Sequence, residues 1–144
     1  MSAVALIVED EIFVALDLER ILTDAGYRVA GIAADRPTAL DLANNCAFAF
    51  VDVNLRDGPT GPEIAAALAR QHGVRVVFVT ANPAHITDDT GAIAFVRKPF
   101  SEQAIRTAAA IASAQLDPAN LTTDEIVLLS NDNAAYPSDK SAQG

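Results

Sequence analysis

Five short apolar segments alternate along the chain with longer segments of mixed polarity. The apolar segments are residues 4–8, 27–33, 48–53, 75–80 and 94–96. Segments that are apolar at nearly every position are typical of parallel strands, because such strands are buried on both faces. Between them, apolar residues recur at helical spacing. The pattern therefore predicts an α/β fold in which helices cover both faces of a five-stranded parallel sheet.

Residues that begin or end helices support this interpretation. Asp35 and Ser101 are side chains of the N-cap type, and the helix that follows Asp35 is expected to reach about residue 45. Gly26 and Gly73 follow helical segments, at positions where glycine readily takes the left-handed conformation. The crossover at 82–91 is rich in residues that disfavour helices, so it predicts only a short or irregular fourth helix.

Polar and charged residues lie at the ends of four predicted strands. Because right-handed crossovers bring the carboxyl ends of parallel strands to one edge of the sheet, we expect these residues to share a site. Each of them alone fits an ordinary surface or capping role, but facing carboxylates destabilise a protein unless a cation joins them. The residues are Glu9, Asp10, Glu11, Asp52, Asn54, Thr80, Ala81, Arg97 and Lys98.

A divalent cation is the partner that these carboxylates predict. Mg²⁺ prefers oxygen ligands, takes one or two carboxylates and keeps several waters. We expect it between Asp10 and Asp52, with Glu9 acting through a water molecule. The predicted metal ligands are Glu9, Asp10, Asp52 and the backbone carbonyl of Asn54.

The remaining residues at this edge suit a phosphoryl group. Phosphoryl transfer depends on positioning and on neutralisation of charge. The Lys98 ammonium, the Thr80 hydroxyl and the Ala81 backbone N–H supply both. Asp52 is then a metal ligand and also the candidate nucleophile.

Four ordered motifs resemble the receiver domains of two-component response regulators. They are IVEDE at 7–11, the strand that ends in Asp52, VTA at 79–81, and Lys98-Pro99-Phe100. The resemblance covers about residues 3–115 and extends to single-domain receivers of the chemotaxis type. It implies a flavodoxin-like, doubly wound sheet with the strand order 2-1-3-4-5.

The resemblance also implies roles for single residues. Asp52 would accept a phosphoryl group from a sensor histidine kinase or a phosphotransfer protein, with Mg²⁺ required and Lys98 as the invariant lysine. The chain would then catalyse only its own phosphorylation and dephosphorylation. Thr80 would be the switch hydroxyl, and Phe95 would move inward with it. The Lys98-Pro99 bond is often cis in such domains.

Two features depart from most receivers. Arg56 stands four residues after Asp52, where most receivers have proline, and the DGPTG sequence at 57–61 resembles receivers of alphaproteobacterial stress and light signalling. The distance from Thr80 to Lys98 is 18 positions, about one helical turn shorter than usual. The surface that commonly carries output or dimerisation is therefore altered, and we expect a monomer or a weak dimer.

The acidic composition excludes some classes of partner. A net charge of -9 disfavours non-specific binding to nucleic acid or to an anionic membrane. Cys46 is the single cysteine, which excludes an intramolecular disulfide and a cysteine-based zinc site. The N-terminus has no signal-peptide pattern, and no apolar stretch approaches the ~18 residues of a membrane span. We therefore expect a cytoplasmic protein.

The composition changes after residue 115. We expect a receiver domain at 1–115 and an acidic tail at 116–144, which holds five acidic residues and one basic residue. Thr122 and Glu125 have capping-box spacing, so 123–129 is expected to form either a short helix or part of a mobile tail, with the remainder disordered. A further DNA-binding domain does not fit in this length. The expected function is thus a stand-alone response regulator that signals through a downstream partner or serves as a phosphate sink.

Two other classes of function stay open. A degenerate receiver would act only as a binding module, although the presence of Asp52, Thr80 and Lys98 argues against it. A hydrolase with an aspartyl nucleophile would need a second acid two residues beyond Asp52. The chain has Asn54 at that position.

Overall fold

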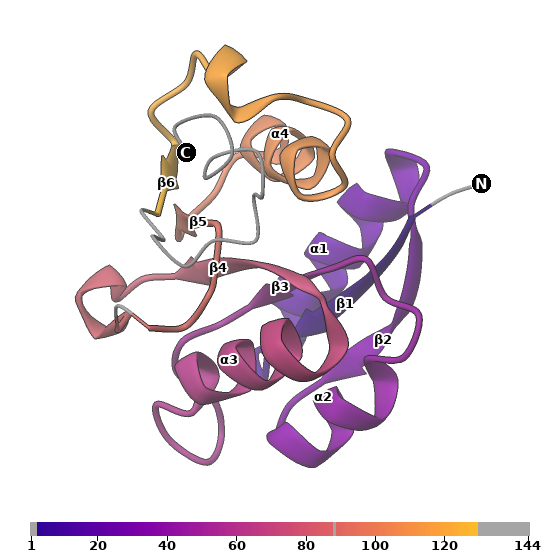
Figure 1. Ribbon diagram of the computed structural model, residues 1–144, viewed down its shortest axis with the longest axis vertical. Helices are drawn as coiled ribbons and strands as arrows, with labels where there is room; N and C mark the ends of the chain where they lie inside the picture. The colour runs from indigo at the N-terminus through magenta and orange to yellow at the C-terminus, as the bar shows by residue number, and fades with distance from the viewer. Residues whose placement is uncertain (1–2, 88, 130–144) are drawn as a thin grey trace, which may run out of the picture.

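The computed structural model describes residues 3–87 and 89–129 of the 144-residue chain. Its strands form one sheet in the order β2-β1-β3-β4-β5-β6. They are β1 Val4–Val8, β2 Arg28–Ala33, β3 Phe48–Val51, β4 Arg75–Thr80, β5 Ala94–Arg97 and β6 Ile126–Leu128. The first five strands are parallel, which confirms the predicted doubly wound order, and β6 is antiparallel to β5 (Figure 1).

Two helices cover each face of the sheet. On one face α1 (Ile12–Asp24) lies beside α4 (Glu102–Ala112), and on the other α2 (Arg36–Leu42) lies beside α3 (Gly61–His72) (Figure 1). Each helix buries an apolar stripe against the sheet, as the helical spacing predicts. Among the described residues, no helix combines the length and the apolar character that crossing a membrane requires.

The helix ends lie close to where the sequence places them. Asp35 and Ser101 each accept a hydrogen bond from the backbone N–H three residues later, as expected of N-cap residues. Gly73 ends α3 in the left-handed conformation, with a φ of 67°. The end of α2 differs from the expected residue 45. The helix stops at Leu42, and Asn45 takes a φ of 70°, which no helix continues through.

The fourth crossover contains a single turn of 3-10 helix, η1 (Pro83–His85). This confirms the prediction that the fourth helix is short or irregular. Asp88, one of the residues behind that prediction, lies outside the described residues. Gly91 has a φ of 78°, so the crossover reaches β5 through a turn rather than through a helix.

The segment after α4 is where the structure departs from the sequence-based expectation. After a 3-10 turn, η2 (Pro118–Asn120), the chain forms β6 on the free edge of β5, so the sheet has six strands instead of five. The helix expected at 123–129 is wrong, because Ile126 is buried against the sheet and β5 supplies the backbone partners that an isolated helical turn lacks. The disorder expected for the end of the tail falls on residues outside the described part of the chain.

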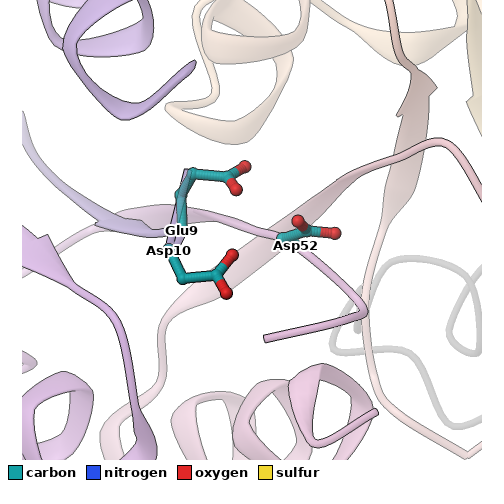
Figure 2. A group of neighbouring side chains, drawn as sticks. All are labelled: Glu9, Asp10 and Asp52. Carbon is teal, nitrogen blue, oxygen red and sulfur yellow. The ribbon is translucent and has the colours of Figure 1, made fainter. Parts of the chain in front are cut away.

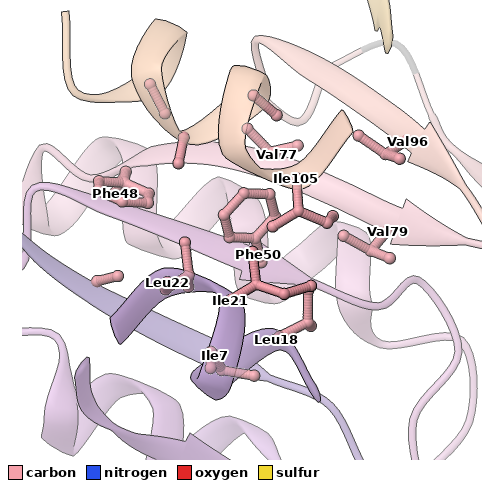
Figure 3. Close-up of a cluster of buried hydrophobic side chains, with 14 of the residues drawn as sticks. Ile7, Leu18, Ile21, Leu22, Phe48, Phe50, Val77, Val79, Val96 and Ile105 are labelled. Carbon is pink, nitrogen blue, oxygen red and sulfur yellow. The ribbon is translucent and has the colours of Figure 1, made fainter. Parts of the chain in front are cut away.

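The sheet separates two apolar cores. Figure 3 shows the larger one, between the sheet and the α1–α4 layer. Tyr27, Phe48 and Phe50 form an edge-to-face series in it, with ring centroids 5.2 and 6.0 Å apart. The other core lies under α2 and α3 and contains the buried Cys46. Both cores hold the strands rigidly, which fixes the positions of the residues that follow them.

Gly61, at the start of α3, packs against the turn that follows β3. Its N–H donates to the carbonyl oxygen of Val53 (2.9 Å). A methyl group on Gly61 would overlap the carbonyl oxygen of Asp52 and lie 2.6 Å from Cα of Val53. These neighbours are backbone atoms, so they cannot move aside as a flexible side chain does. Glycine is therefore required here by close approach of two backbone segments.

We expect Gly61→Ala to lower the free energy of unfolding by roughly 1–3 kcal/mol, since it overpacks a rigid contact. Urea unfolding measures this change. Gly31→Ala is the matched control, because a methyl group there meets only the end of the Leu42 side chain, 2.8 Å away, which is able to rotate. Equal destabilisation by the two substitutions would contradict the explanation.

Candidate functional site

Three carboxylates gather at the ends of two neighbouring strands. Glu9 and Asp10 follow β1, and Asp52 follows β3; the strands are paired in parallel, with Val8 opposite Val51. Each of the three side chains offers one oxygen, and these oxygens lie within 4.8 Å of one another. Figure 2 shows Asp10 and Asp52 directed towards the same space, with Glu9 beside them. Glu9 and Asp52 are buried, so their charges are little screened by water.

The Lys98 ammonium is the cation that joins these groups. It comes directly after β5, and its Nζ lies 3.0 Å from Glu9 Oε1, 3.0 Å from Asp52 Oδ2 and 2.9 Å from Glu11 Oε1. Burial by itself lowers the pKa of Lys98, but its contacts with Glu11, Glu9 and Asp52 outweigh burial and raise the pKa above the usual value. The lysine is therefore held in its charged form.

Glu9 has an incomplete set of partners despite this ion pair. Its Oε2 accepts a hydrogen bond from the N–H of Glu11 (3.1 Å). Its Oε1 is buried and close to Lys98 Nζ, yet it accepts no hydrogen bond of acceptable geometry. The pKa of Glu9 is raised to about 7, chiefly by burial and also by the charge of Asp52, against the lowering effect of Lys98 and of the Glu11 N–H. A second cation close to Oε1 would favour the ionised form.

These residues fit a Mg²⁺ ion. The donor atoms are hard carboxylate oxygens, which Mg²⁺ prefers. Glu9 also has a buried oxygen, Oε1, that accepts no hydrogen bond of acceptable geometry. Lys98 carries one positive charge and contacts two of these three carboxylates, those of Glu9 and Asp52, whereas no contact joins it to Asp10 among the described residues. A divalent cation would be held by Asp10 and Asp52, with Glu9 nearby, and would balance the remaining charge.

Asn54 and Thr80 lie at the same edge with defined partners. The Asn54 N–H donates to Asp52 Oδ1 (3.2 Å), which fixes the orientation of that carboxylate. Thr80 is fully buried at the end of β4; its Oγ1 accepts from the N–H of Asn82 (2.9 Å), and its carbonyl oxygen accepts from the N–H of Lys98 (2.9 Å). The hydroxyl proton of Thr80 is thus not used in the Asn82 contact.

The other predicted residues also follow β4 or lie in β5. Ala81 is exposed directly after β4, at the position from which its N–H was expected to meet a phosphoryl group. Phe95 is half-buried in β5, opposite Phe78 of β4. The Lys98-Pro99 peptide is cis, as expected. The assigned roles of these residues, and the Asn54 carbonyl as a metal ligand, stay predictions.

Two contacts were not anticipated. Glu11 was grouped with the strand-end acids but given no role, and it is the third carboxylate on Lys98. His85, in η1, places its Nδ1 3.4 Å from Oδ1 of Asn54. In the sequence, only the position of Glu11 directly after Asp10 suggests its contact with Lys98. No sequence pattern suggests the contact of His85 with Asn54, because that contact depends on where η1 places His85.

The raised pKa of Glu9 has a consequence for stability. Glutamate ionises in the unfolded chain near its ordinary pKa of 4.5, whereas in the folded protein it ionises near 7. Below pH 4.5 the Glu9 carboxyl is protonated in both states, and its contribution to stability is fully present. As the pH rises from 4.5 towards 7, Glu9 ionises in the unfolded chain but not in the folded protein, so the free energy of unfolding falls by ~1.4 kcal/mol for each unit of difference between the two pKa values.

We expect Glu9→Gln to be more stable than the wild type at pH 8 without divalent cations, by roughly 2–3 kcal/mol, and this gain to shrink towards zero near pH 4.5. Urea unfolding in a chelator across this pH range measures the difference. Glu63→Gln, on an exposed side chain paired with Arg36, is the matched control for removal of a carboxylate. A gain that is independent of pH, or a loss at pH 8, would contradict the expectation.

Comparisons with known proteins agree with this geometry. A sequence model described as "Response regulator receiver domain" matches residues 5–110. The chain is 33% identical over 105 residues to the phyllosphere-induced regulator PhyR of Methylorubrum extorquens, covering 69% of this chain and 39% of that protein. It is 34% identical over 101 residues to the transcriptional regulatory protein PdtaR of Mycobacterium tuberculosis, covering 67% and 49%. The chain therefore spans between two fifths and half of the length of these relatives.

Solved structures of receiver domains are also similar to this chain. The receiver domain of PhyR from Erythrobacter litoralis superposes with a TM-score of 0.71 at 29% identity, covering 85% of this chain and 95% of that domain. A CheY-like receiver from Methanospirillum hungatei has a TM-score of 0.69 at 24% identity, covering 80% and 97%, which shows the shared fold. The PhyR matches support the alphaproteobacterial subgroup that the loop after Asp52 indicated. The chain belongs to the response regulator receiver domain family.

Proposed function

We propose that this chain is a receiver of a two-component phosphorelay, phosphorylated on Asp52 with Mg²⁺. The observation that carries the proposal is the contact of one charged lysine, Lys98, with buried Asp52 and Glu9 beside a third carboxylate. An arrangement of this kind concentrates negative ligands for a metal and keeps a positive charge at the nucleophile. Both are what a phosphoryl group needs on arrival.

The proposed phosphodonor is a phosphohistidine on a sensor histidine kinase or a phosphotransfer protein. An Asp52 carboxylate oxygen attacks phosphorus, the O–P bond forms, and the P–N bond breaks with its electron pair staying on the imidazole, which then takes a proton. The bound metal would neutralise the phosphoryl oxygens. Lys98 exchanges part of its contact with Asp52 for the new phosphoryl oxygens, and the Thr80 hydroxyl, already held by Asn82, has its proton available to donate.

Loss of the phosphoryl group ends the signal at the same residue. Water attacks phosphorus, the O–P bond breaks, and Asp52 and inorganic phosphate result. The chain thus acts on its own aspartyl phosphate rather than on an external substrate, in keeping with Asn54 standing where a hydrolase would need an acid. The same proposal has two further parts. The chain signals by binding a partner when it is phosphorylated or serves as a phosphate sink, and it works in the cytoplasm as a monomer or weak dimer.

An apolar surface lies directly beside the site. Ile12, Phe13 and Leu16, in the first turns of α1, are 56%, 83% and 45% exposed. They follow Glu11, which contacts Lys98. Neighbouring exposed apolar side chains commonly mark a protein interface, and a helix of the phosphodonor protein packed here would bring its phosphohistidine to Asp52. We propose this surface as the docking site of the phosphodonor.

Phosphorylation at Asp52 is tested with a small-molecule phosphodonor. Incubation with acetyl phosphate and Mg²⁺ is expected to add one phosphoryl group to the wild type, measured by intact-protein mass spectrometry, and none to Asp52→Asn. Asp57→Asn is the matched control, because Asp57 lies in the loop that follows β3 and bonds only to Thr60 among the contacts of the described chain. Equal labelling of the Asp52→Asn protein would show that the nucleophile is a different residue.

The docking surface is tested by comparing donors. We expect Phe13→Ser to reduce the rate of phosphotransfer from the cognate kinase at least tenfold, since a central exposed aromatic often dominates an interface, and to leave labelling by acetyl phosphate unchanged. Leu128→Ser removes another exposed apolar side chain, from β6 on a different part of the surface, and is expected to change neither rate. A fall in both rates for Phe13→Ser would mean that Phe13 supports the site itself.

A further inference from the structure

The sixth strand occupies the only edge of β5 that β4 leaves unpaired. Ile126, Val127 and Leu128 pair with Val96, Phe95 and Ala94 respectively. The N–H of Leu129 continues the pairing by donating to the carbonyl oxygen of Ile93 (3.0 Å). In Figure 1 this strand runs alongside β5 at the margin of the sheet. A segment that follows the last helix thus covers the end of the sheet nearest Lys98.

The attachment of β6 is weak compared with that of the other strands. It has three residues, and of these only Ile126 is buried. Val127 and Leu128 are 41% and 43% exposed. The segment is also held by Ser101 Oγ, which donates to Glu125 Oε1 (2.6 Å), and by Leu129, which is half-buried against the second core. Segments with so few buried apolar contacts open at low free energy while the rest of the fold stays intact.

Phe95 links this strand to the candidate site. It lies opposite Val127 on one side and opposite Phe78 on the other, so all three side chains share a face of the sheet. Thr80 is two residues beyond Phe78 on that same face, which makes it a diagonal neighbour of Phe95. A displacement of the Thr80 hydroxyl therefore changes the space beside Phe95, and a displacement of Phe95 removes the surface on which Val127 packs.

A cavity connects the same residues. It has a volume of about 360 Å³ and lies between β5 and the segment before β6. Its lining includes Phe95, Lys98, Asp124, Glu125 and Val127. The cavity leaves room for the Phe95 side chain and the Lys98 region to rearrange, and it places acidic residues of the tail beside the lysine that holds Asp52.

We propose that residues 124–129 occupy the edge of β5 in competition with any other extended segment. They are paired with β5 while Asp52 is unphosphorylated, and they are released through Thr80 and Phe95 when Asp52 is phosphorylated. This inference rests on the proposed function. Phosphorylation draws the Thr80 hydroxyl towards the phosphoryl group, Phe95 turns into the space beside it, and Val127 loses its neighbour on that face of the sheet, which leaves β6 held by Ile126 on the other face. Release bares the backbone N–H and C=O groups of β5, a surface to which an extended segment can add.

The experiment measures amide hydrogen exchange in the full chain by NMR, with and without Mg²⁺ and beryllofluoride, which mimics an aspartyl phosphate. The Leu129 amide reports on β6, since it donates to Ile93, and the Ile93 amide is the internal control, since it donates to Val76 within the β4–β5 pair. We expect beryllofluoride to accelerate exchange at Leu129 at least tenfold and to leave Ile93 within twofold. Unchanged or slower exchange at Leu129, in protein that binds beryllofluoride, overturns the inference.

Variants test the route and its reciprocity. Thr80→Ala, compared with the wild type at beryllofluoride concentrations that saturate each protein, is expected to show no faster exchange at Leu129. Because coupling between two sites is reciprocal, Ile126→Ala, which loosens β6, is expected to raise the affinity for beryllofluoride severalfold, whereas Leu128→Ala is not. Glu125→Ala, which loses the Ser101 contact, gives a second loosened variant should Ile126→Ala disturb the fold. Loosened β6 with unchanged affinity overturns the inference.

Failure of the inference differs from failure of the proposed function. Wild-type protein that neither binds beryllofluoride nor gains a phosphoryl group from acetyl phosphate contradicts the proposed function and the inference together. Protein that is labelled on Asp52, but whose Leu129 amide does not respond, retains the proposed function and contradicts the release of β6 alone.

Discussion

Electrostatic balance around one ammonium group is the constraint on which the rest of the site depends. Lys98 lies within 3.0 Å of the carboxylates of Glu9, Glu11 and Asp52, two of which are buried. Without that positive charge the gathered acids would repel one another in a poorly screened environment. The balance is still incomplete, since a buried Glu9 oxygen has no hydrogen-bond donor and burial raises the pKa of Glu9 to about 7. A divalent cation at the site would complete that balance.

The parallel sheet places the charged side chains of the site close together. Glu9 and Asp52 follow adjacent strands, and Lys98 is joined to Thr80 of the neighbouring strand by a backbone hydrogen bond. The positions are set by strand register and not by the helices. This explains why a crossover with only one 3-10 turn, η1, leaves Lys98 in contact with the acids. The family match, which ends at residue 110, covers all of these elements.

The strand β6 lies beyond the part of the chain that matches the family sequence model. Two features favour this strand. β5 is short and has an open edge, and the fourth crossover has no full helix, which leaves room for the aliphatic residues Ile126 to Leu129 to pack there. One residue of this strand, Val127, pairs with Phe95. A weakly held strand in contact with a residue next to Thr80 is a means of connecting the chemistry of the site to the surface of the protein.

The sequence by itself determined the features that depend on local chemistry or on a repeated pattern. The parallel strands, the caps at Asp35 and Ser101 and the turn at Gly73 follow from residue type and spacing, and right-handed crossovers then require Asp10 and Asp52 to meet. Only the tertiary structure decided what the segment 123–129 became, because its capping pattern favours a helix locally whereas an unpaired edge of β5 favours a strand. The contact of Glu11 with Lys98 and the backbone approach at Gly61 were decided in the same way. Each of these contacts joins atoms that are far apart in the chain, and no local pattern of residues indicates that they lie close together in space.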